Sequence, residues 1–381
     1  MENNDKIYLD NATTTLPKLP ELNKVVDNYL TCYNLSPNRT IGNNDLEKIR
    51  KRVLNYFDAP DNYNVAFTYG ATLAMNIAVK SLARNNECNV ITTNCEHHCV
   101  YRPLEEYNVK YNIAEYMDEN QKEHVDKIIE KIDNNTSAVI MNHGSNVTGN
   151  IFNVEAACKK IKENKRDILF IVDVSQTAGF LDISVKKMNA DILIGAAHKH
   201  LYGLPGIGYI IYRNDINLEP VYYGGTGIMS SKMQQPRELP NMLEAGTMNM
   251  IGIMALDECI KILNKEKRNE YRQHEEELVR YFLRKSKEIN NIKVFCGEEG
   301  NRTGVISFKI DGLDSNYVVA PYLLERGNIL VRSGLHCAPM IHKALKTFPE
   351  GTVRISFSKN SKKEEIDKLI EVLKELNEDE L

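Results

Sequence analysis

The sequence predicts an α/β fold in which a large domain with a mostly parallel sheet flanked by helices precedes a smaller α+β domain. Apolar runs of strand length alternate with helical patterns up to about residue 254. After residue 254, a long charged segment leads to short strands and a final amphipathic helix. A chain of 381 residues is also long for a single simple core, which agrees with two domains.

The first part of the chain alternates helices and strands. Residues 44–57 place apolar side chains on one helical face: Leu46, Ile49, Val53, Leu54 and Phe57. The predicted elements that follow are the strand 64–68, a helix from about residue 72, the strand 89–93, a helix after residue 97, the strand 137–142, the helix 154–163 and the strand 168–174. This alternation predicts a parallel sheet with its ligand site beyond the carboxyl ends of the strands.

The second part begins with residues 263–288, which we interpret as an exposed helix with a solvated charged face that connects the two domains. Strands are predicted at 304–310, 328–333 and 352–358, followed by a helix with Ser361 and Glu364 at the spacing of a capping box. We expect a large domain over 16–254 and a small C-terminal domain over 255–381. The segment 1–15 is expected to pack near the small domain.

Composition narrows the class of partner. The net charge of −4 gives no reason to expect binding to nucleic acid or to an anionic membrane. No signal-like N-terminus and no run of eighteen apolar residues occurs, so we expect a cytoplasmic protein. The eight cysteines are scattered, which favours reduced thiols. The cluster Cys95–Cys99 contains metal-ligand types, but without a zinc spacing we favour a loop or one functional histidine and expect no metal.

Three features at successive strand ends indicate a cofactor. The turn Tyr69–Thr72 opens a helix and can offer backbone N–H groups to a phosphate. Asp173 ends a very apolar strand, where a carboxylate needs a cationic partner, and Lys199 lies between two apolar segments. Taken singly, each has an ordinary explanation: a capped turn, an ion-paired aspartate and a surface lysine. Together they match what pyridoxal 5'-phosphate requires.

An ordered series of motifs along nearly the whole chain then resembles the class V aminotransferases, and within them the cysteine desulfurases and selenocysteine lyases of the SufS-like group. These motifs are "IYLDNATTT", "SPNRTIGNN", "TYGATLAMNIAVKSL", "CEHHCVYRPLEEY", "NHGSNVTGNIF", "IVDVSQTAGFLDI", "AAHKHLYGLPGIGYIIY", "LEAGTMNM", "RSGLHCAP" and "TVRISFSKNSKKEEIDKL". The resemblance implies the fold type I of pyridoxal-phosphate enzymes.

The resemblance also implies roles around the cofactor ring. Lys199 would form the Schiff base and later move protons, and Asp173 would pair with the pyridine nitrogen. Gln176 would bind the phenolic oxygen. His97 would stack on the ring, and Asn146 would position cofactor and substrate.

Further residues are implied for the phosphate. Ala71, Thr72 and His198 would bind it, and Thr247 would reach the phosphate of a neighbouring subunit, which implies a homodimer. One position departs from the family: Ala196 stands where a phosphate-binding serine or threonine is usual. Losing that hydroxyl would cost about 1 kcal/mol of cofactor affinity.

For the substrate, Arg354 would grip the carboxylate, because a guanidinium can do so with two parallel hydrogen bonds. Arg39 and Arg332 are further candidates for shaping the pocket. Cys337 would attack the sulfur of L-cysteine as a thiolate, whose formation His336 and Arg332 could favour. L-Alanine would leave, and the persulfide would pass to an acceptor protein, as in iron–sulfur cluster assembly.

Other interpretations stay open at this point. L-Selenocysteine could be the substrate instead, which makes a selenocysteine lyase. The chain could also catalyse another class V reaction, such as aminotransfer, epimerisation or a kynureninase-type cleavage, with Cys337 structural, because fold and cofactor do not fix the reaction. A non-catalytic scaffold is the last alternative, and Ala196 is its only hint.

Overall fold

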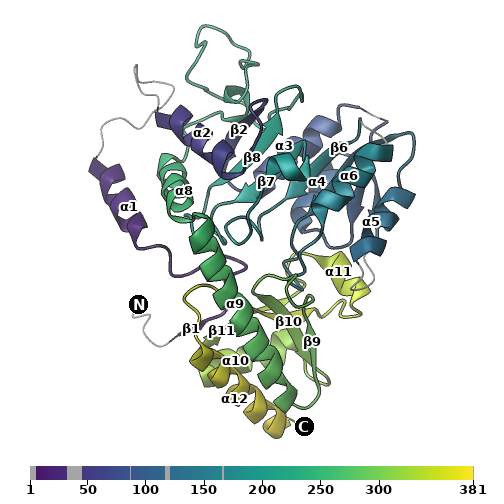
Figure 1. The fold of residues 1–381 in the computed structure, drawn as a ribbon, viewed down its shortest axis with the longest axis vertical. Helices are drawn as coiled ribbons and strands as arrows, with labels where there is room; N and C mark the ends of the chain where they lie inside the picture. The colour runs from purple at the N-terminus through teal and green to yellow at the C-terminus, as the bar shows by residue number, and fades with distance from the viewer. Residues whose placement is uncertain (1–5, 32–44, 86, 116–120, 165–166, 381) are drawn as a thin grey trace.

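Two sheets, one above the other in Figure 1, organise the chain. The computed structural model describes residues 6–31, 45–85, 87–115, 121–164 and 167–380. A seven-stranded sheet forms the upper part, and a four-stranded sheet lies below it. The long helix α9 (Lys265–Lys285) runs from the first part to the second.

The large sheet has the order β2 (Tyr63–Thr68), β8 (Gly208–Arg213), β7 (Ile192–Ala196), β6 (Leu169–Asp173), β5 (Thr136–Asn142), β3 (Asn89–Thr93) and β4 (Lys110–Ala114). Strand β8 runs antiparallel to both of its neighbours, and the other described pairs are parallel. The predicted mostly parallel sheet is therefore confirmed.

Helices cover both faces of this sheet. Val139 and Met141 of β5 pack into one apolar cluster, whereas Ala138 and Ile140 pack into the other. The first cluster includes side chains of α1 (Glu21–Thr31), α2 (Asp45–Tyr56), α5 (Gln121–Glu130), α6 (Val154–Asn164), α7 (Val185–Met188) and α8 (Met250–Ile262). The second includes α3 (Ala71–Leu82) and α4 (His98–Glu106). Burial on both faces explains why these strands read as continuous apolar runs.

The smaller sheet is antiparallel, with the order β12 (Arg332–Gly334), β13 (Thr352–Ser356), β10 (Val305–Ile310) and β9 (Ile292–Phe295). A third apolar cluster joins it to α9, α10 (Ala320–Gly327) and α12 (Lys363–Glu380). Strand β1 (Ile7–Tyr8) pairs with β11 (Ile329–Leu330), and Leu9 enters the same cluster. The short helices η1 (Asn241–Leu243), η2 (Ser286–Glu288), η3 (Ser315–Val319) and α11 (Pro339–Ala344) complete the elements.

The interpretation of α9 as a solvated charged face is wrong for two of its residues. Arg268 is buried and pairs with Asp182, and the buried Glu275 accepts from His200 Nε2 at 3.2 Å. These pairs hold α9 against loops of the large sheet. Buried charges need such partners because desolvation is costly.

The capping contacts of α12 lie one residue later than predicted. Glu365, rather than Glu364, accepts from the N–H of Lys362 at 2.9 Å. The hydroxyl of Ser361 instead accepts from the N–H of Ser358 at 3.1 Å. Ser361 thus closes the turn before the helix.

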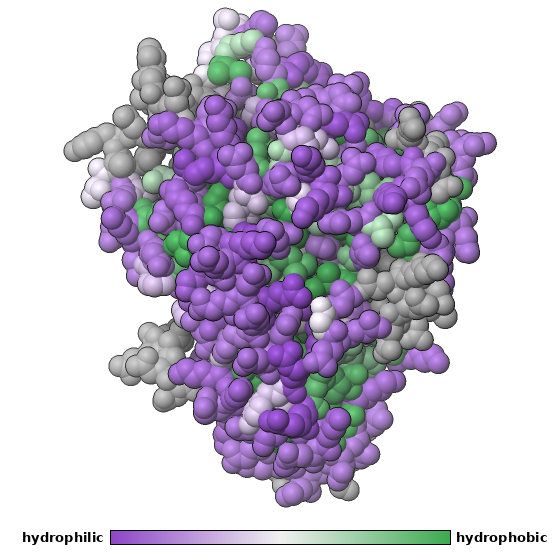
Figure 2. All heavy atoms as spheres, in the orientation of Figure 1, coloured by the Kyte–Doolittle hydropathy of each residue, from purple (hydrophilic) through white to green (hydrophobic). Residues whose placement is uncertain are grey.

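Figure 2 shows a mainly hydrophilic face with scattered hydrophobic residues. Within the described parts of the chain, no helix is long and apolar enough to span a membrane.

Candidate active site

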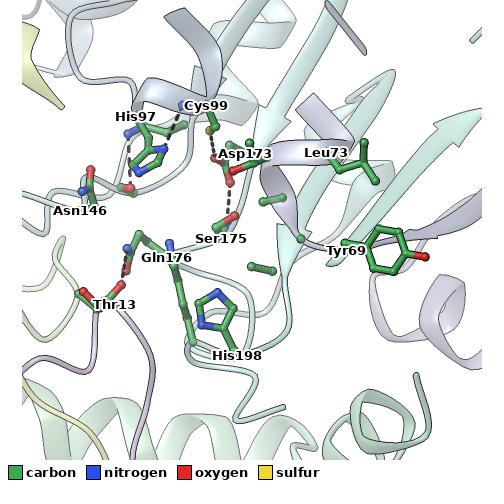
Figure 3. A pocket seen from close by; sticks show the side chains of 18 of the residues that line it. Thr13, Tyr69, Leu73, His97, Cys99, Asn146, Asp173, Ser175, Gln176 and His198 are labelled. Carbon is green, nitrogen blue, oxygen red and sulfur yellow. Dashed lines mark hydrogen bonds between the residues drawn. The ribbon is translucent and has the colours of Figure 1, made fainter. Parts of the chain in front are cut away.

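A cavity of about 590 Å³ opens at the carboxyl ends of the large sheet's strands. Its walls come from the turn after β2, the loop after β3, the ends of β5, β6 and β7, and the N-terminal segment. Arg332 and Arg354 of the smaller sheet close it. Residues far apart in the sequence therefore share one space, as Figure 3 shows for ten of them.

Asp173 lies on the cavity wall at the end of β6 and is 7% exposed. Its Oδ1 accepts from the N–H of Ser175 at 2.8 Å, and its Oδ2 accepts from Cys99 Sγ at 3.8 Å (Figure 3). Neither contact is with a cation. Both carboxylate oxygens therefore keep acceptor capacity for a ligand in the cavity.

Lys199 follows β7 and lines the same cavity. Burial lowers the pKa of its ammonium group, and the charge of Asp173 only partly opposes this effect. The N-terminal segment holds the loop that contains Lys199. The carbonyl of His198 accepts from the N–H of Thr15 at 3.0 Å and from Lys18 Nζ at 2.8 Å. A lowered pKa favours the neutral, nucleophilic form of the amine.

His97 is the N-cap residue of α4 and is neutral. Its Nδ1 accepts from the N–H of Cys99 at 3.0 Å, which leaves the proton on Nε2. Burial, with the charge of Lys199 as a second cause, lowers the pKa of His97 to about 3. Figure 3 shows its ring across the cavity from His198.

The turn before α3 has the form of an anion site. The N-cap residue is Gly70, so the first-turn amides of α3 have no side-chain cap. A Cβ on Gly208 would lie 2.5 Å from the carbonyl carbon of Gly70, so glycine at 208 permits this close approach. Thr72 lies in the first turn of α3 and is exposed. It is therefore not the N-cap residue, as a helix that starts at about residue 72 would suggest.

His198 and Ala196 also line the cavity. Burial lowers the pKa of His198 to about 4, and its Nδ1 is buried without a partner among the described residues. Gln176 shows the same pattern: its Nε2 donates to the carbonyl of Ala12 at 3.1 Å, while its Oε1 has no described partner. Two orphaned polar atoms beside one cavity indicate a polar ligand.

Arg354 is 1% exposed and held on several sides. Its Nη1 donates to the carbonyl of Asn146 at 3.0 Å, and its Nη2 donates to Asp10 Oδ1 at 2.6 Å. Its Nε is buried and lacks a partner in the described part of the chain. Asn146 in turn donates from Nδ2 to the carbonyl of His336 at 2.8 Å, which ties the arginine to the cysteine loop.

Cys337 lies in that loop, beside the cavity rather than on its wall. Arg332 Nη2 is 3.1 Å from its Sγ. His336 points elsewhere: its Nε2 pairs with Thr352 Oγ1 at 3.0 Å, and burial lowers its pKa well below the usual value. Of the two residues expected to favour ionisation, only Arg332 contacts the sulfur.

The backbone of this loop is strained, since His336 and Cys337 have φ of 50° and 58°. Two hydrogen bonds fix the conformation, from Asn146 to His336 as above and from the N–H of His98 to the carbonyl of Cys337 at 2.7 Å. The position of the thiol is therefore imposed by the surrounding structure.

Thr247, the predicted contact to a neighbouring subunit's phosphate, does not line this cavity. Thr247 is exposed, and its carbonyl accepts from the hydroxyl of Tyr69 at 3.4 Å. Arg39 lies outside the described residues. No group of three or more His, Cys, Asp or Glu side chains suited to a metal ion occurs in the ranges that the structure describes.

The comparison with protein families decides what kind of protein carries this site. A family model described as aminotransferase class-V matches residues 7–369. The chain belongs to the class-V aminotransferase family.

Similar proteins in this family include cysteine desulfurases. A probable cysteine desulfurase of Methanothermobacter thermautotrophicus is 29% identical over 98% of this chain and 95% of its own length. The cysteine desulfurase of Wigglesworthia glossinidia brevipalpis is 28% identical over 98% and 93%, respectively. Among solved structures, the apo cysteine desulfurase of Thermococcus onnurineus NA1 has a TM-score of 0.85 at 27% identity, over 99% of this chain and 96% of its own. The predicted fold is thus confirmed.

The cavity residues that were not predicted as part of the site include Thr13, Cys99 and Ser175. Asp10, which pairs with Arg354, was also missed. Asp10 and Thr13 lie within the quoted motif "IYLDNATTT", which was a usable signal. Their contacts with residues more than 300 positions away could not be read from the sequence.

Proposed function

We propose that this class-V enzyme is a pyridoxal-phosphate-dependent cysteine desulfurase, which converts L-cysteine to L-alanine and receives the sulfur on Cys337. One observation carries the proposal: the guanidinium of Arg332 lies 3.1 Å from Cys337 Sγ, beside the cavity that Lys199 and Asp173 line. A guanidinium N–H at that distance orients the sulfur, and the thiolate is the form of cysteine that attacks. The relatives named above support the same activity.

The residues of the cavity fit the cofactor. The open first turn of α3, Ala71, Thr72 and the orphaned Nδ1 of His198 suit its phosphate, and the second amide N–H of Gln176 suits the phenolic oxygen of its ring. Asp173 would bind the ring nitrogen, Lys199 would hold the cofactor, and His97 would lie against the ring. When bound, pyridoxal phosphate withdraws electrons from the substrate's α-carbon.

The arginine pair would bind and orient the substrate. Arg354 has an unpaired, buried Nε–H, and a substrate carboxylate is an acceptor that would satisfy it. Asn146 supports that arginine through its carbonyl and the cysteine loop through its side chain. Substrate bound at Arg354 would thereby be held in register with Cys337.

Each step then uses a group of this chain. The amine of Lys199 moves the proton of the substrate α-carbon, and the Nε2–H of His97 can donate a hydrogen bond to a group in the cavity. The Cys337 thiolate attacks the substrate sulfur and forms a sulfur–sulfur bond. The carbon–sulfur bond breaks and its electron pair stays on the substrate β-carbon, which takes up a proton. Lys199 returns a proton to the α-carbon before alanine leaves.

The same proposal extends to partners. We propose a cytoplasmic homodimer in which Thr247, exposed in one chain, reaches the phosphate site of the other, and a protein that accepts the persulfide sulfur. The strained, tightly held cysteine loop supports an acceptor that docks at the site, because such a loop does not carry the sulfur far.

The test is a comparison of L-cysteine, L-selenocysteine and an amino donor with a keto acid, using purified protein loaded with pyridoxal phosphate. We expect alanine and sulfide equivalents from L-cysteine, lost in Cys337→Ala and kept in Cys296→Ala, which removes the other partly exposed cysteine among the described residues. Selenide release that survives in Cys337→Ala would add selenocysteine lyase activity. Full activity of Cys337→Ala on L-cysteine would refute the nucleophile role, and transamination alone would refute the desulfurase.

A further inference from the structure

The hydroxyl of Thr13 is the meeting point of the two arginines described above. It accepts from Arg354 Nη2 at 2.9 Å and from Arg332 Nη1 at 3.2 Å, and it donates to Asp10 Oδ1 at 2.9 Å. A threonine hydroxyl has one donor and two acceptor sites, so these contacts use all of them. The hydroxyl therefore has a fixed orientation.

The two guanidinium groups repel each other, so the Thr13 hydroxyl that accepts from both of them is important for keeping them side by side. Arg354 is nearly inaccessible, and the neighbouring charge of Arg332 adds to the burial that lowers its pKa. Asp10 offsets the charge of Arg354, with its Oδ1 2.6 Å from Nη2. Arg332 makes no ion pair with a described residue. Within the described part of the chain, its guanidinium group hydrogen-bonds only Thr13 and Cys337.

The backbone around Thr13 is held to the same strand as Arg354. Asn11 Nδ2 donates to the carbonyl of Ser356 at 2.8 Å, and the N–H of Ala12 donates to Ser356 Oγ at 2.8 Å. The carbonyl of Ala12 also accepts from Gln176 Nε2 in the turn after β6 of the large sheet. Thr13 is thus fixed relative to both sheets and to β13.

We propose that Thr13 is a positioning residue that holds Arg354 and Arg332 in one unit, so that the carboxylate-binding arginine and the thiol-binding arginine keep a fixed separation. The role of Arg354 toward a substrate rests on the proposed function, whereas the contact of Arg332 with Cys337 does not. Without the Thr13 hydroxyl, Arg332 loses its only described partner other than the thiol and its guanidinium moves more freely. The thiolate is then held less well, and the substrate is less well aligned with it.

The experiment compares wild type, Thr13→Val, Thr13→Ser and Thr14→Ala, all loaded with pyridoxal phosphate and checked for folding by thermal melting. Valine removes the hydroxyl but keeps the branched shape, serine keeps the hydroxyl, and Thr14 contacts the carbonyl of His198 rather than either arginine. The first readout is the rate at which iodoacetamide alkylates Cys337, followed by mass spectrometry of its peptide. The second is KM for L-cysteine. Should Thr13→Val not fold, Thr13→Ala gives the same comparison.

We expect Thr13→Val to slow alkylation of Cys337 and to raise KM, each by about fivefold, the factor that one ordinary hydrogen bond supplies. Thr13→Ser should restore both values to within about twofold of wild type, and Thr14→Ala should leave the alkylation rate of Cys337 unchanged. An unchanged alkylation rate in Thr13→Val overturns the inference, even if activity falls. If alkylation follows the expected pattern while wild type makes no alanine from L-cysteine, the bridge to the thiol stands and the proposed function fails.

Discussion

Replacing Gly208 by alanine tests the phosphate turn without touching any group proposed to bind the cofactor directly. A Cβ at this position would lie 2.5 Å from the carbonyl carbon of Gly70, 2.7 Å from its Cα and 2.8 Å from the N of Ala71. All three are backbone atoms, so no side chain can rotate away. The start of α3 must therefore move by several tenths of an ångström or more.

The expected size of the effect follows from the hydrogen bonds at stake. A backbone N–H that donates to a charged group contributes about 1.5–3 kcal/mol. Misplacing one such donor therefore weakens binding by about 2 kcal/mol, which is roughly a 30-fold higher Kd for pyridoxal phosphate. The matched control is Gly224→Ala, whose Cβ would meet its nearest atom, Ala245 Cβ, at an ordinary 3.8 Å.

The assay is equilibrium titration of cofactor-free protein with pyridoxal phosphate, followed by its visible absorbance, with thermal melting to verify folding. We expect the Kd to rise in Gly208→Ala and to stay at the wild-type value in Gly224→Ala. A folded Gly208→Ala protein with wild-type affinity would refute the assignment of the phosphate to the turn at Gly70.

Further predictions concern the substrate arginine and a buried acid. Arg354→Lys should raise KM for L-cysteine about 30-fold, because one ammonium cannot keep the guanidinium's contacts with Asn146 and Asp10 and also donate to the substrate carboxylate. Arg326→Lys on the exposed face of α10 should not change KM, and equal KM values of wild type and Arg354→Lys in steady-state assays would contradict this role. Glu96 is fully buried, and burial raises its pKa to about 8 from 4.5. The folded protein thus keeps a proton that the unfolded chain releases, so wild type should lose up to about 1.4 kcal/mol of stability per pH unit between pH 4.5 and 8 through this group. Glu96→Gln cannot ionise and should lack that loss. The measurement is the free energy of unfolding of both proteins in urea at several pH values, and parallel curves would show that Glu96 is already ionised in the folded protein.

The sequence predicted correctly the elements that have a distinctive local pattern and a functional residue at their end. Buried strands such as β6 are recognisable because their apolar runs are short and continuous, and the residue that ends β6, Asp173, lies in the cavity as expected from the position of strand ends. Strands β4 and β9 were not predicted. Exposed and half-exposed residues alternate at β4, with lysine and asparagine in place of an apolar run.

Contacts between distant segments could not be predicted. The bridge from Thr13 to Arg332 and Arg354 joins residues more than 300 positions apart, and no local pattern encodes it. Adjacency was also misleading at Cys337, since the neighbouring His336 turns into the interior toward Thr352. The domain limits stay a prediction, and the packing of α8 with the core of the large sheet favours a boundary after residue 262.

The proposed reaction leaves the substrate sulfur on Cys337. The decisive measurement is mass spectrometry of the peptide that contains Cys337 after the loaded enzyme has been mixed with L-cysteine and quenched without reductant. We predict one added sulfur atom on Cys337 in wild type and none in Lys199→Ala, with alanine formed in step with the persulfide. Alanine production with Cys337 unmodified, or with the added sulfur on another cysteine, would contradict the account.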